Sequence, residues 1–183
     1  VIERKGATTG MLVSQGFQDV LDIAMERRYD LFDLRLRFAE PVVPRNQRAE
    51  IPERIMFDGS VSTELDETAV GAAVTKLTEN HDIEALAICF LHSYANPSHE
   101  ERARKIAKAI HPDLRITTSN EVLPFMREYE RWTTTTINAY VQPLTSRYLD
   151  NLERGLAEMG FRGHLLVMTS SGGMATPALA RRF

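Results

Sequence analysis

The sequence predicts an α/β fold, with a mixed, mostly parallel sheet and helices on both faces. The clearest strand is the run ALAICFL at residues 85–91, which is continuously apolar, as in strands buried on both sides. The segments between such runs show the three-to-four-residue periodicity of helices. Strands separated by helices require crossover connections, which join parallel strands.

The amino-terminal part begins with one strand and one helix. GMLVSQGF, residues 10–17, is a short apolar run between glycines and is typical of a strand. Apolar residues spaced from Phe17 to Ala24 predict a helix, capped near Gln18 or Asp19.

Residues 26–64 are predicted to form a surface excursion and a hairpin. Helical periodicity fails after Glu26, and the aromatic side chains of this stretch are expected to pack on the surface; they are Tyr29, Phe32 and Phe38. Two extended runs flank Asp58-Gly59, a pair of residues typical of a tight hairpin turn.

The middle of the chain alternates helices with strands. Asp66 is expected to cap a helix that runs through Leu77, before the strand at residues 85–91. Asn96 and Pro97 suit the start of the next helix. LRITTS, residues 114–119, and HLLVMTS, residues 164–170, are the last two predicted strands.

A long, kinked helix is predicted at residues 128–160. Pro143 lacks an amide hydrogen and is expected to bend it, while Gly160 is a suitable terminator. The helix is expected to bury one apolar stripe, formed by Ile137, Tyr140, Val141, Leu144, Tyr148, Leu152 and Leu156.

Four consecutive threonines, residues 133–136, occupy the first turns of this helix. Threonine is a weak helix former, so the run needs a reason. Two interpretations stand. The hydroxyls donate to carbonyls of their own helix, or they point at something beyond it.

The composition is that of an ordinary globular protein. Apolar residues make up 43% and charged residues 26%, the net charge is −3, and no basic block favours nucleic acid or an anionic membrane. No apolar run approaches the ~20 residues of a membrane span. The single cysteine, Cys89, lies inside an apolar run and is expected to be buried and unreactive, which fits the reducing cytoplasm.

Three polar segments are candidate sites. His92 and His99 flank the start of a helix and could converge on a metal or an anion, although a metal site normally has a third ligand, so none is predicted. The loop Ser171-Gly172-Gly173 could offer amides to an anion or simply form a turn from strand to helix.

The third segment, SNEVLPFMREYERW, brings several charges to the start of the long helix. Glu121, Arg127, Glu128, Glu130 and Arg131 could orient a polar substrate or form surface ion pairs.

Four stretches, in order, carry a resemblance to a known family: ERKGATTGMLVSQGFQDVL, CFLHSYANPSHE, SNEVLPFMREYERWTTTTINAYVQPLTSRYLDNLE and LLVMTSSGGM. Together they resemble the hydantoinase A/oxoprolinase family over nearly the whole chain. The resemblance implies a fragment of an actin/hexokinase-like fold, from the N-terminal region of an ATP-dependent enzyme acting on cyclic amides. The family's phosphate loop would precede Val1, and a later nucleotide motif would follow Phe183.

The resemblance implies ATP and magnesium in the intact enzyme, with neither expected to bind this chain tightly, and a partner subunit or domain of the hydantoinase B type. The carried-over catalytic candidates are Arg127, Glu128, Glu130, Arg131 and Asn138. Thr134 and Thr135 join the loop Ser171, Gly172 and Gly173 as candidates to contact substrate or nucleotide, with His92 and His99 as further candidates.

Three functions remain open. The leading hypothesis is an ATP-dependent hydrolase of cyclic amides. The first alternative is an ATP-dependent carboxylase of ketones, such as acetone or acetophenone. The second is a structural module whose aromatic excursion docks a partner subunit.

Overall fold

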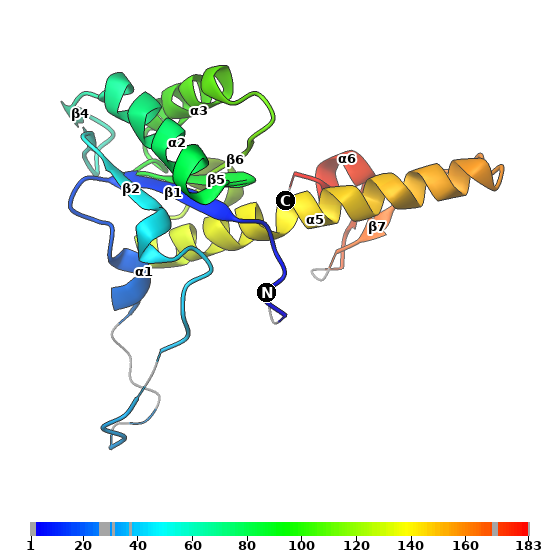
Figure 1. Cartoon of the computed structure of the whole chain (residues 1–183), viewed down its shortest axis with the longest axis horizontal. Coiled ribbons are helices and arrows are strands. Elements are labelled where there is room, and N and C mark those ends of the chain that lie inside the picture. Colours follow the sequence, from blue (N-terminus) through cyan, green and yellow to red (C-terminus); the bar gives the residue numbers. More distant parts are fainter. Residues whose placement is uncertain (1–2, 26–29, 31, 37, 170–171, 183) are drawn as a thin grey trace.

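Four parallel strands form the central sheet. The computed structural model describes residues 3–25, 30, 32–36, 38–169 and 172–182. The strands are β1 (Thr9–Ser14), β2 (Arg48–Ile51), β5 (Ala85–Cys89) and β6 (Arg115–Thr118), in the order β2–β1–β5–β6 (Figure 1). Leu12 of β1 lies opposite Ala49 of β2 on one side and Ile88 of β5 on the other. The predicted parallel sheet is confirmed.

Side chains of the strands alternate between two cores. Leu12, Leu86 and Ile88 pack in the core beneath α2 (Glu67–His81) and α3 (Ser98–Ile110). Met11, Ala87 and Cys89 point the other way and pack with Trp132 and Ala139 of α5 (Glu128–Glu158). Helices therefore cover both faces of the sheet, as the continuously apolar strands predict.

The two helices on one face begin at the predicted signals. The side chain of Asp66 accepts a hydrogen bond from the amide of Ala69 at 2.9 Å, which caps α2. The side chain of Asn96 accepts from the amide of Ser98 at 3.1 Å, and Pro97 precedes the first turn of α3.

Of the predicted stripe, Tyr140 is buried, but helix α5 otherwise buries a different face. Leu144 and Tyr148 were expected in the stripe, yet their side chains are 49% and 64% exposed. The buried residues of α5 are instead Arg131, Trp132, Thr135, Thr136, Asn138, Ala139, Tyr140, Pro143, Ser146 and Leu149. Most of these are small or polar, and small side chains let a helix lie close to a sheet. The prediction counted only large apolar residues and so missed this face.

The helix also extends well past the sheet. Pro143 lies inside α5, which is one helix from Glu128 to Glu158. Figure 1 shows α5 extending beyond the last strand of the sheet, with α6 (Pro177–Ala180) beside it. Gly160 follows the helix end with a positive φ of 78°, as expected of a terminator.

The last predicted strand does not join the sheet. β7 (Val167–Met168) pairs antiparallel with β8 (Met174–Ala175) in a separate two-stranded hairpin. The glycine-containing turn therefore connects two strands rather than a strand and a helix. The prediction of a further strand of the main sheet at residues 164–170 was wrong. Only Val167 and Met168 of this segment form a strand, and they pair with Ala175 and Met174 instead of with the main sheet.

The segment 26–64 contains the expected hairpin. β3 (Arg54–Ile55) and β4 (Val61–Thr63) pair antiparallel around Gly59, whose φ is 83°. The side chain of Asp58 accepts from the amide of Ser60 at 2.9 Å, which stabilises the turn. Short helices α1 (Val20–Ile23), η1 (Arg45–Gln47) and α4 (Ser119–Val122) complete the chain.

The aromatic excursion departs from expectation. Tyr29 lies outside the described residues, and Phe32 is 93% exposed rather than packed on the surface. Phe38 is about half exposed.

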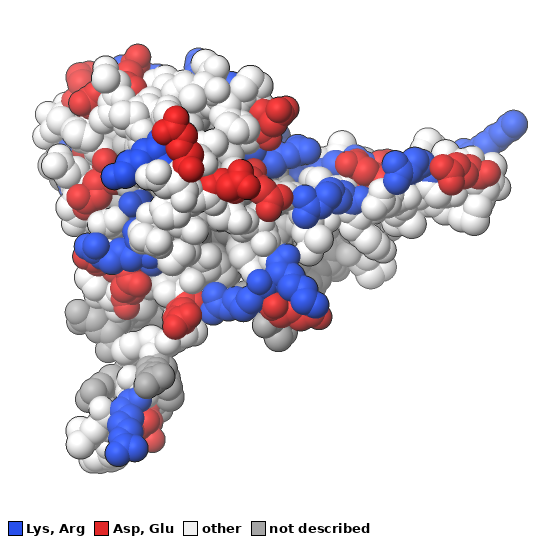
Figure 2. All heavy atoms as spheres, viewed as in Figure 1, with Lys and Arg blue, Asp and Glu red and all other residues white. Residues whose placement is uncertain are grey.

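Basic and acidic side chains are interspersed over the face shown in Figure 2, including the length of α5. Within the described part of the chain, no helix combines the length and hydrophobicity that crossing a bilayer requires.

Candidate functional site

Polar side chains meet in a buried network at the carboxyl ends of β1, β5 and β6, the edge where α/β sheets commonly hold ligands. Ser14 is the last residue of β1, and its hydroxyl donates to a carboxylate oxygen of Glu53. The amide of Leu91 donates to the same hydroxyl at 2.8 Å. The other oxygen of Glu53 accepts from His99 Nδ1 at 2.8 Å. All three side chains are buried, so the network ties β1, the β3 hairpin and α3 together.

Glu100 forms the second part of this network. It lies in the first turn of α3, is 1% exposed, and accepts hydrogen bonds from the amides of Phe90 and Asn120, both at 2.9 Å. The hydroxyl of Ser119 donates to Glu100 Oε1 at 2.6 Å. Burial raises the pKa of Glu100, although these three hydrogen bonds oppose the shift.

Arg131 brings the start of α5 into the same network. Its Nε donates to the Ser119 hydroxyl at 3.1 Å and its Nη2 to the carbonyl of Phe90 at 3.0 Å. The guanidinium also lies 5.6 Å from the centre of the Tyr94 ring. Burial lowers the pKa of Arg131, while the negative charge of Glu100 acts in the opposite direction. An arginine and a glutamate of opposite charge are thus buried together around one serine.

These hydrogen bonds are expected to make the network rigid, and they leave few of its polar atoms free to react. Glu100 and Arg131 are joined through the Ser119 hydroxyl, and both also bind backbone groups. The exception is His99 Nε2, which is buried without a hydrogen-bond partner and lies 3.9 Å from a carboxylate oxygen of Glu64. The arrangement can hold the loops after β5 and β6 and the first turn of α5 in fixed positions.

The charged cluster at the start of α5 divides into two parts. Only Arg131 lies inside the network. Arg127 and Glu130 form an ion pair of 3.4 Å near the surface, and Glu128 is exposed. Arg127 also lies 5.9 Å from the centre of the Phe125 ring. Arg127 and Glu128 are exposed and Glu130 is partly exposed, whereas Arg131 is not exposed at all.

The threonine run serves its own helix at three of four positions. The hydroxyls of Thr134 and Thr135 donate to the carbonyls of Glu130 and Arg131, both at 2.7 Å, and that of Thr136 donates to the Thr133 carbonyl at 3.0 Å. Thr133 differs, because its hydroxyl is buried and has no partner. Thr133 and Thr136 line a hollow of about 210 Å³ beside Pro41.

The two histidines do not share a partner. His92 Nδ1 lies 3.4 Å from the Tyr94 hydroxyl, and His92 has a positive φ of 53° in the turn after β5, whereas His99 turns to Glu53. In the part of the chain that the structure describes, no three His, Cys, Asp or Glu side chains are grouped to hold a metal ion.

The remaining candidates either contact the carboxyl-terminal segment, as Asn138 does, or belong to it, as Ser171, Gly172 and Gly173 do. Asn138 donates to the carbonyl of Arg182 at 3.2 Å. Ser171 falls outside the described residues. Gly172 has a φ of 89°, and its amide donates to the carbonyl of Thr169 at 3.0 Å, while the Gly173 carbonyl accepts from the Thr169 amide at 2.8 Å. The glycines thus close the β7–β8 turn.

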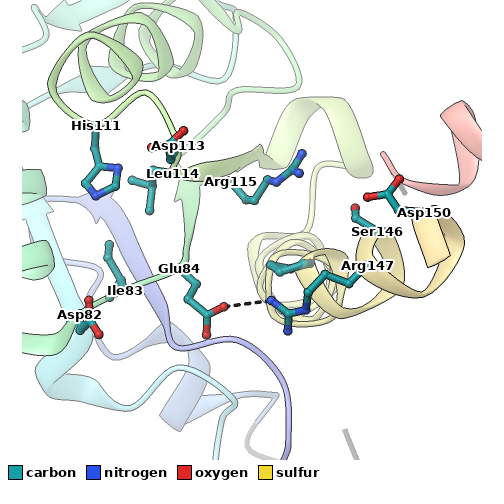
Figure 3. Close-up of a pocket in the computed structure, with 11 residues that line it drawn as sticks. Asp82, Ile83, Glu84, His111, Asp113, Leu114, Arg115, Ser146, Arg147 and Asp150 are labelled. Carbon is teal, nitrogen blue, oxygen red and sulfur yellow. Dashed lines mark hydrogen bonds and ion pairs between the residues drawn. The ribbon is translucent and has the colours of Figure 1, made fainter. Parts of the chain in front are cut away.

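A separate hollow of about 350 Å³ lies at the opposite edge of the sheet, before β5 and β6 begin. Figure 3 shows Glu84 and Arg147 facing each other across it, 3.3 Å apart, with Ser146 on the same helix as Arg147. The Ser146 hydroxyl is buried without a partner. The sequence patterns pointed to the carboxyl edge of the sheet and did not predict this hollow.

Four residues of the buried network escaped sequence reasoning: Ser14, Glu53, Glu100 and Ser119. A glutamate in the first turn of a helix, such as Glu100, ordinarily complements the helix dipole, and Glu53 lies within the segment predicted as a hairpin, so no sequence pattern marks either as buried. The signal that could have found Ser14 and Ser119 is their place at the ends of apolar strands, because a polar residue there is carried to the carboxyl edge of the sheet.

Comparisons with known proteins match nearly the whole length of the chain. A model of the hydantoinase/oxoprolinase N-terminal region matches residues 1–111, and a hydantoinase/oxoprolinase model matches residues 131–183. An uncharacterised protein of Methanocaldococcus jannaschii is 41% identical over 90% of this chain and 24% of its own length. The caprolactamase subunit alpha of Pseudomonas jessenii is 36% identical over 99% of this chain and 26% of its own length.

Two solved structures share the fold. The crystal structure of the ATP-dependent caprolactamase from Pseudomonas jessenii matches with a TM-score of 0.90 over 96% of this chain and 26% of that one. A nucleotide-free acetone carboxylase structure, 26% identical, matches with a TM-score of 0.82 over 99% of this chain and 28% of that one. The chain spans about a quarter of the length of these relatives.

Proposed function

The chain belongs to the hydantoinase/oxoprolinase family, and from that premise we propose that it forms part of an ATP-dependent enzyme that opens cyclic amides. One observation carries the proposal. Nearly the full length of this chain matches the ATP-dependent caprolactamase in both sequence and fold, with 36% identity and a TM-score of 0.90.

The buried network gives this chain a positioning role in such an enzyme. Glu100, Ser119 and Arg131 fix the ends of β5 and β6 against the first turn of α5. The polar groups that remain accessible at this edge are Arg127, Glu128 and Glu130, which we assign to orienting the polar amide of the substrate. Arg131 acts through them as a positioning residue.

The Gly172 amide already donates to Thr169, and among the described residues no three His, Cys, Asp or Glu side chains are grouped to hold a metal ion. We therefore assign neither ATP nor magnesium to a described residue of this chain. In the intact enzyme ATP would supply the phosphoryl group that makes the amide oxygen easier to displace. A partner of the hydantoinase B type and a cytoplasmic location, which the buried thiol of Cys89 suits, belong to the same proposal.

A second candidate function is ATP-dependent ketone carboxylation. The match to the acetone carboxylase structure, with a TM-score of 0.82, favours it as an alternative within the same family. The higher identity to caprolactamase places cyclic amide hydrolysis first.

Turnover assays on the full-length protein with its partner subunit separate the two. Caprolactam, hydantoin and 5-oxoproline are tested for ATP-dependent ring opening, and acetone with bicarbonate for ATP-dependent carboxylation. We expect ring-opened product and ADP with at least one cyclic amide. Carboxylation of the ketone without ring opening of any amide would overturn the first proposal in favour of the second.

The same preparation tests the role assigned to Arg127. We expect Arg127→Gln to raise KM for the amide while leaving the fold intact, because Arg127 is exposed. Arg147→Gln, an exposed arginine at the opposite edge of the sheet, is the matched control and is expected to leave KM unchanged.

A further inference from the structure

A hollow of about 310 Å³ lies at the free edge of β6, away from the buried network. α3 contributes Arg104 and Lys108, β6 contributes Thr117, and α5 contributes Gln142. β6 is the last strand of the sheet, so side chains of α3 and α5 meet around its edge from opposite faces.

Positive charge exceeds negative charge around this hollow. Its lining includes Arg104, Lys108 and Arg182, against the single carboxylate of Glu121. That carboxylate accepts from both arginines. Burial opposes ionisation of Glu121, but these hydrogen bonds prevail and hold its pKa below the ordinary value. With Glu121 ionised, the lining retains an excess of two positive charges.

Three buried polar atoms around the hollow have no hydrogen-bond partner: Thr117 Oγ1, Arg104 Nε and Gln142 Oε1. Thr117 is only 3% exposed, so its unpaired hydroxyl is costly unless something else binds it. Two of the three atoms can donate, and the surrounding charge is positive, which together suit an oxyanion.

The third atom narrows the choice of anion. Gln142 Nε2 lies 3.4 Å from the carbonyl of Arg182, an arrangement that requires the nitrogen on that side. Gln142 Oε1 therefore faces elsewhere as an acceptor and needs a donor. Hydrogen phosphate carries a hydroxyl that can donate, whereas sulfate at neutral pH carries none.

We propose that this hollow is a binding site for hydrogen phosphate or a small ligand bearing that group, held by Arg104, Lys108 and Thr117 and selected by Gln142. Lys108 is exposed and its ammonium now donates to the Pro112 carbonyl at 2.8 Å, so it can turn to the anion without disturbing the core. The site is independent of the proposed amide chemistry.

Titration of the 183-residue chain with inorganic phosphate tests the site, followed by the amide NMR signals of residues 104–117 and by the unfolding temperature. We expect saturable shifts and a rise in unfolding temperature with phosphate, and at least tenfold weaker binding of sulfate at equal ionic strength. Equal binding of sulfate and phosphate, or the absence of saturable shifts, would overturn the proposal.

Two lysines of α3 provide a matched pair of variants. Lys108→Gln is expected to weaken phosphate binding about fivefold or more, while Lys105→Gln, which removes the same charge from an exposed position outside the hollow, leaves it nearly unchanged. Equally weakened phosphate binding in both variants would mean that only the overall charge of the chain matters, and it would contradict a specific site.

Thr117→Val tests the hydroxyl directly. Valine keeps the shape of threonine, and the hydroxyl it removes is unpaired without ligand, so the unfolding temperature in phosphate-free buffer is expected to stay equal or rise. Phosphate binding is expected to weaken about tenfold, the loss of one hydrogen bond to a charged group. Unchanged phosphate affinity in the folded variant would contradict the role of Thr117.

Discussion

Glu100 and Arg131 are bridged by one hydroxyl: Ser119 donates to the carboxylate at 2.6 Å and accepts from the guanidinium at 3.1 Å. The two charges come from helices on opposite faces of the sheet. They meet where β6 ends, so the bridge joins both layers of the fold.

Ser119→Ala should therefore destabilise the chain strongly. It removes a hydrogen bond from a buried carboxylate and from a buried guanidinium at once, and we expect a loss of about 2 to 3 kcal/mol in unfolding free energy. Urea unfolding measures it. Ser60→Ala, at an exposed serine of the hairpin, is the control and should change stability by less than about 0.5 kcal/mol. Equal losses in both variants would show that Ser119 has no special role.

Glu100 should make stability depend on pH in a defined direction. Burial raises its pKa in the folded state, so the folded chain binds more protons than the unfolded chain above the ordinary glutamate pKa of about 4.3. Stability from this group is complete below that value and is lost as pH rises through the folded pKa. The stability advantage of the natural chain over Glu100→Gln should therefore shrink as pH rises from about 4.5. Unfolding curves of both proteins across pH 4.5 to 7.5 check this range. A growing advantage would mean that the hydrogen bonds outweigh burial.

Two leucines of α5 test which face of the helix is buried. Leu149 is 3% exposed, so Leu149→Ala should leave a cavity and cost about 3 kcal/mol. Leu144 is 49% exposed, and Leu144→Ala should cost less than about 1 kcal/mol. Unfolding of the two variants under the same conditions compares them directly. The reverse order would restore the stripe predicted from periodicity.

The threonine run should contribute to the helix rather than to chemistry. Thr134 is exposed and donates to the Glu130 carbonyl, so Thr134→Ala should change stability by less than about 0.5 kcal/mol and leave turnover of the full-length protein unchanged. Thr135 is fully buried, and Thr135→Ala should cost about 1 to 2 kcal/mol through lost packing. A fall in turnover in the Thr134 variant at unchanged stability would revive the interpretation that this hydroxyl contacts substrate or nucleotide.

Cys89 should resist modification in the native chain. Burial raises the pKa of its thiol well above the ordinary value, and its side chain is not exposed. A thiol reagent should label it only as fast as the chain unfolds, so labelling should accelerate with urea. Immediate labelling in native buffer would contradict the position of Cys89 on β5.

The sequence predicted the elements better than the contacts between them. Apolar runs placed β1 and β5, the β-branched run LRITTS placed β6, and local caps such as Asp66 placed the helix starts. All of these signals lie within a few residues of the chain. The buried network that includes Ser14, Glu53, His99 and Glu100 joins residues that are far apart in the sequence. The longest separation is 77 residues, between Ser14 and the amide of Leu91. No local sequence pattern predicts such contacts.

The prediction of the buried face of α5 was wrong for another physical reason. A periodicity count favours large apolar residues such as Leu144, whereas the buried face of α5 includes small or polar residues such as Ala139, Ser146, Thr135 and Thr136. The exposed state of Phe32 likewise shows that hydrophobicity alone does not place a side chain when its segment leaves the sheet.

Helix α5 also has a mechanical consequence. Its 31 residues span about 46 Å, so a tilt of about 5° at the Arg131 end would displace the far end by about 4 Å. The amide hydrogen missing at Pro143 leaves the Ala139 carbonyl without its helical donor, which makes the midpoint the softest place along this rod. The helix therefore magnifies a small change of direction at the buried Arg131 into a larger displacement at its far end.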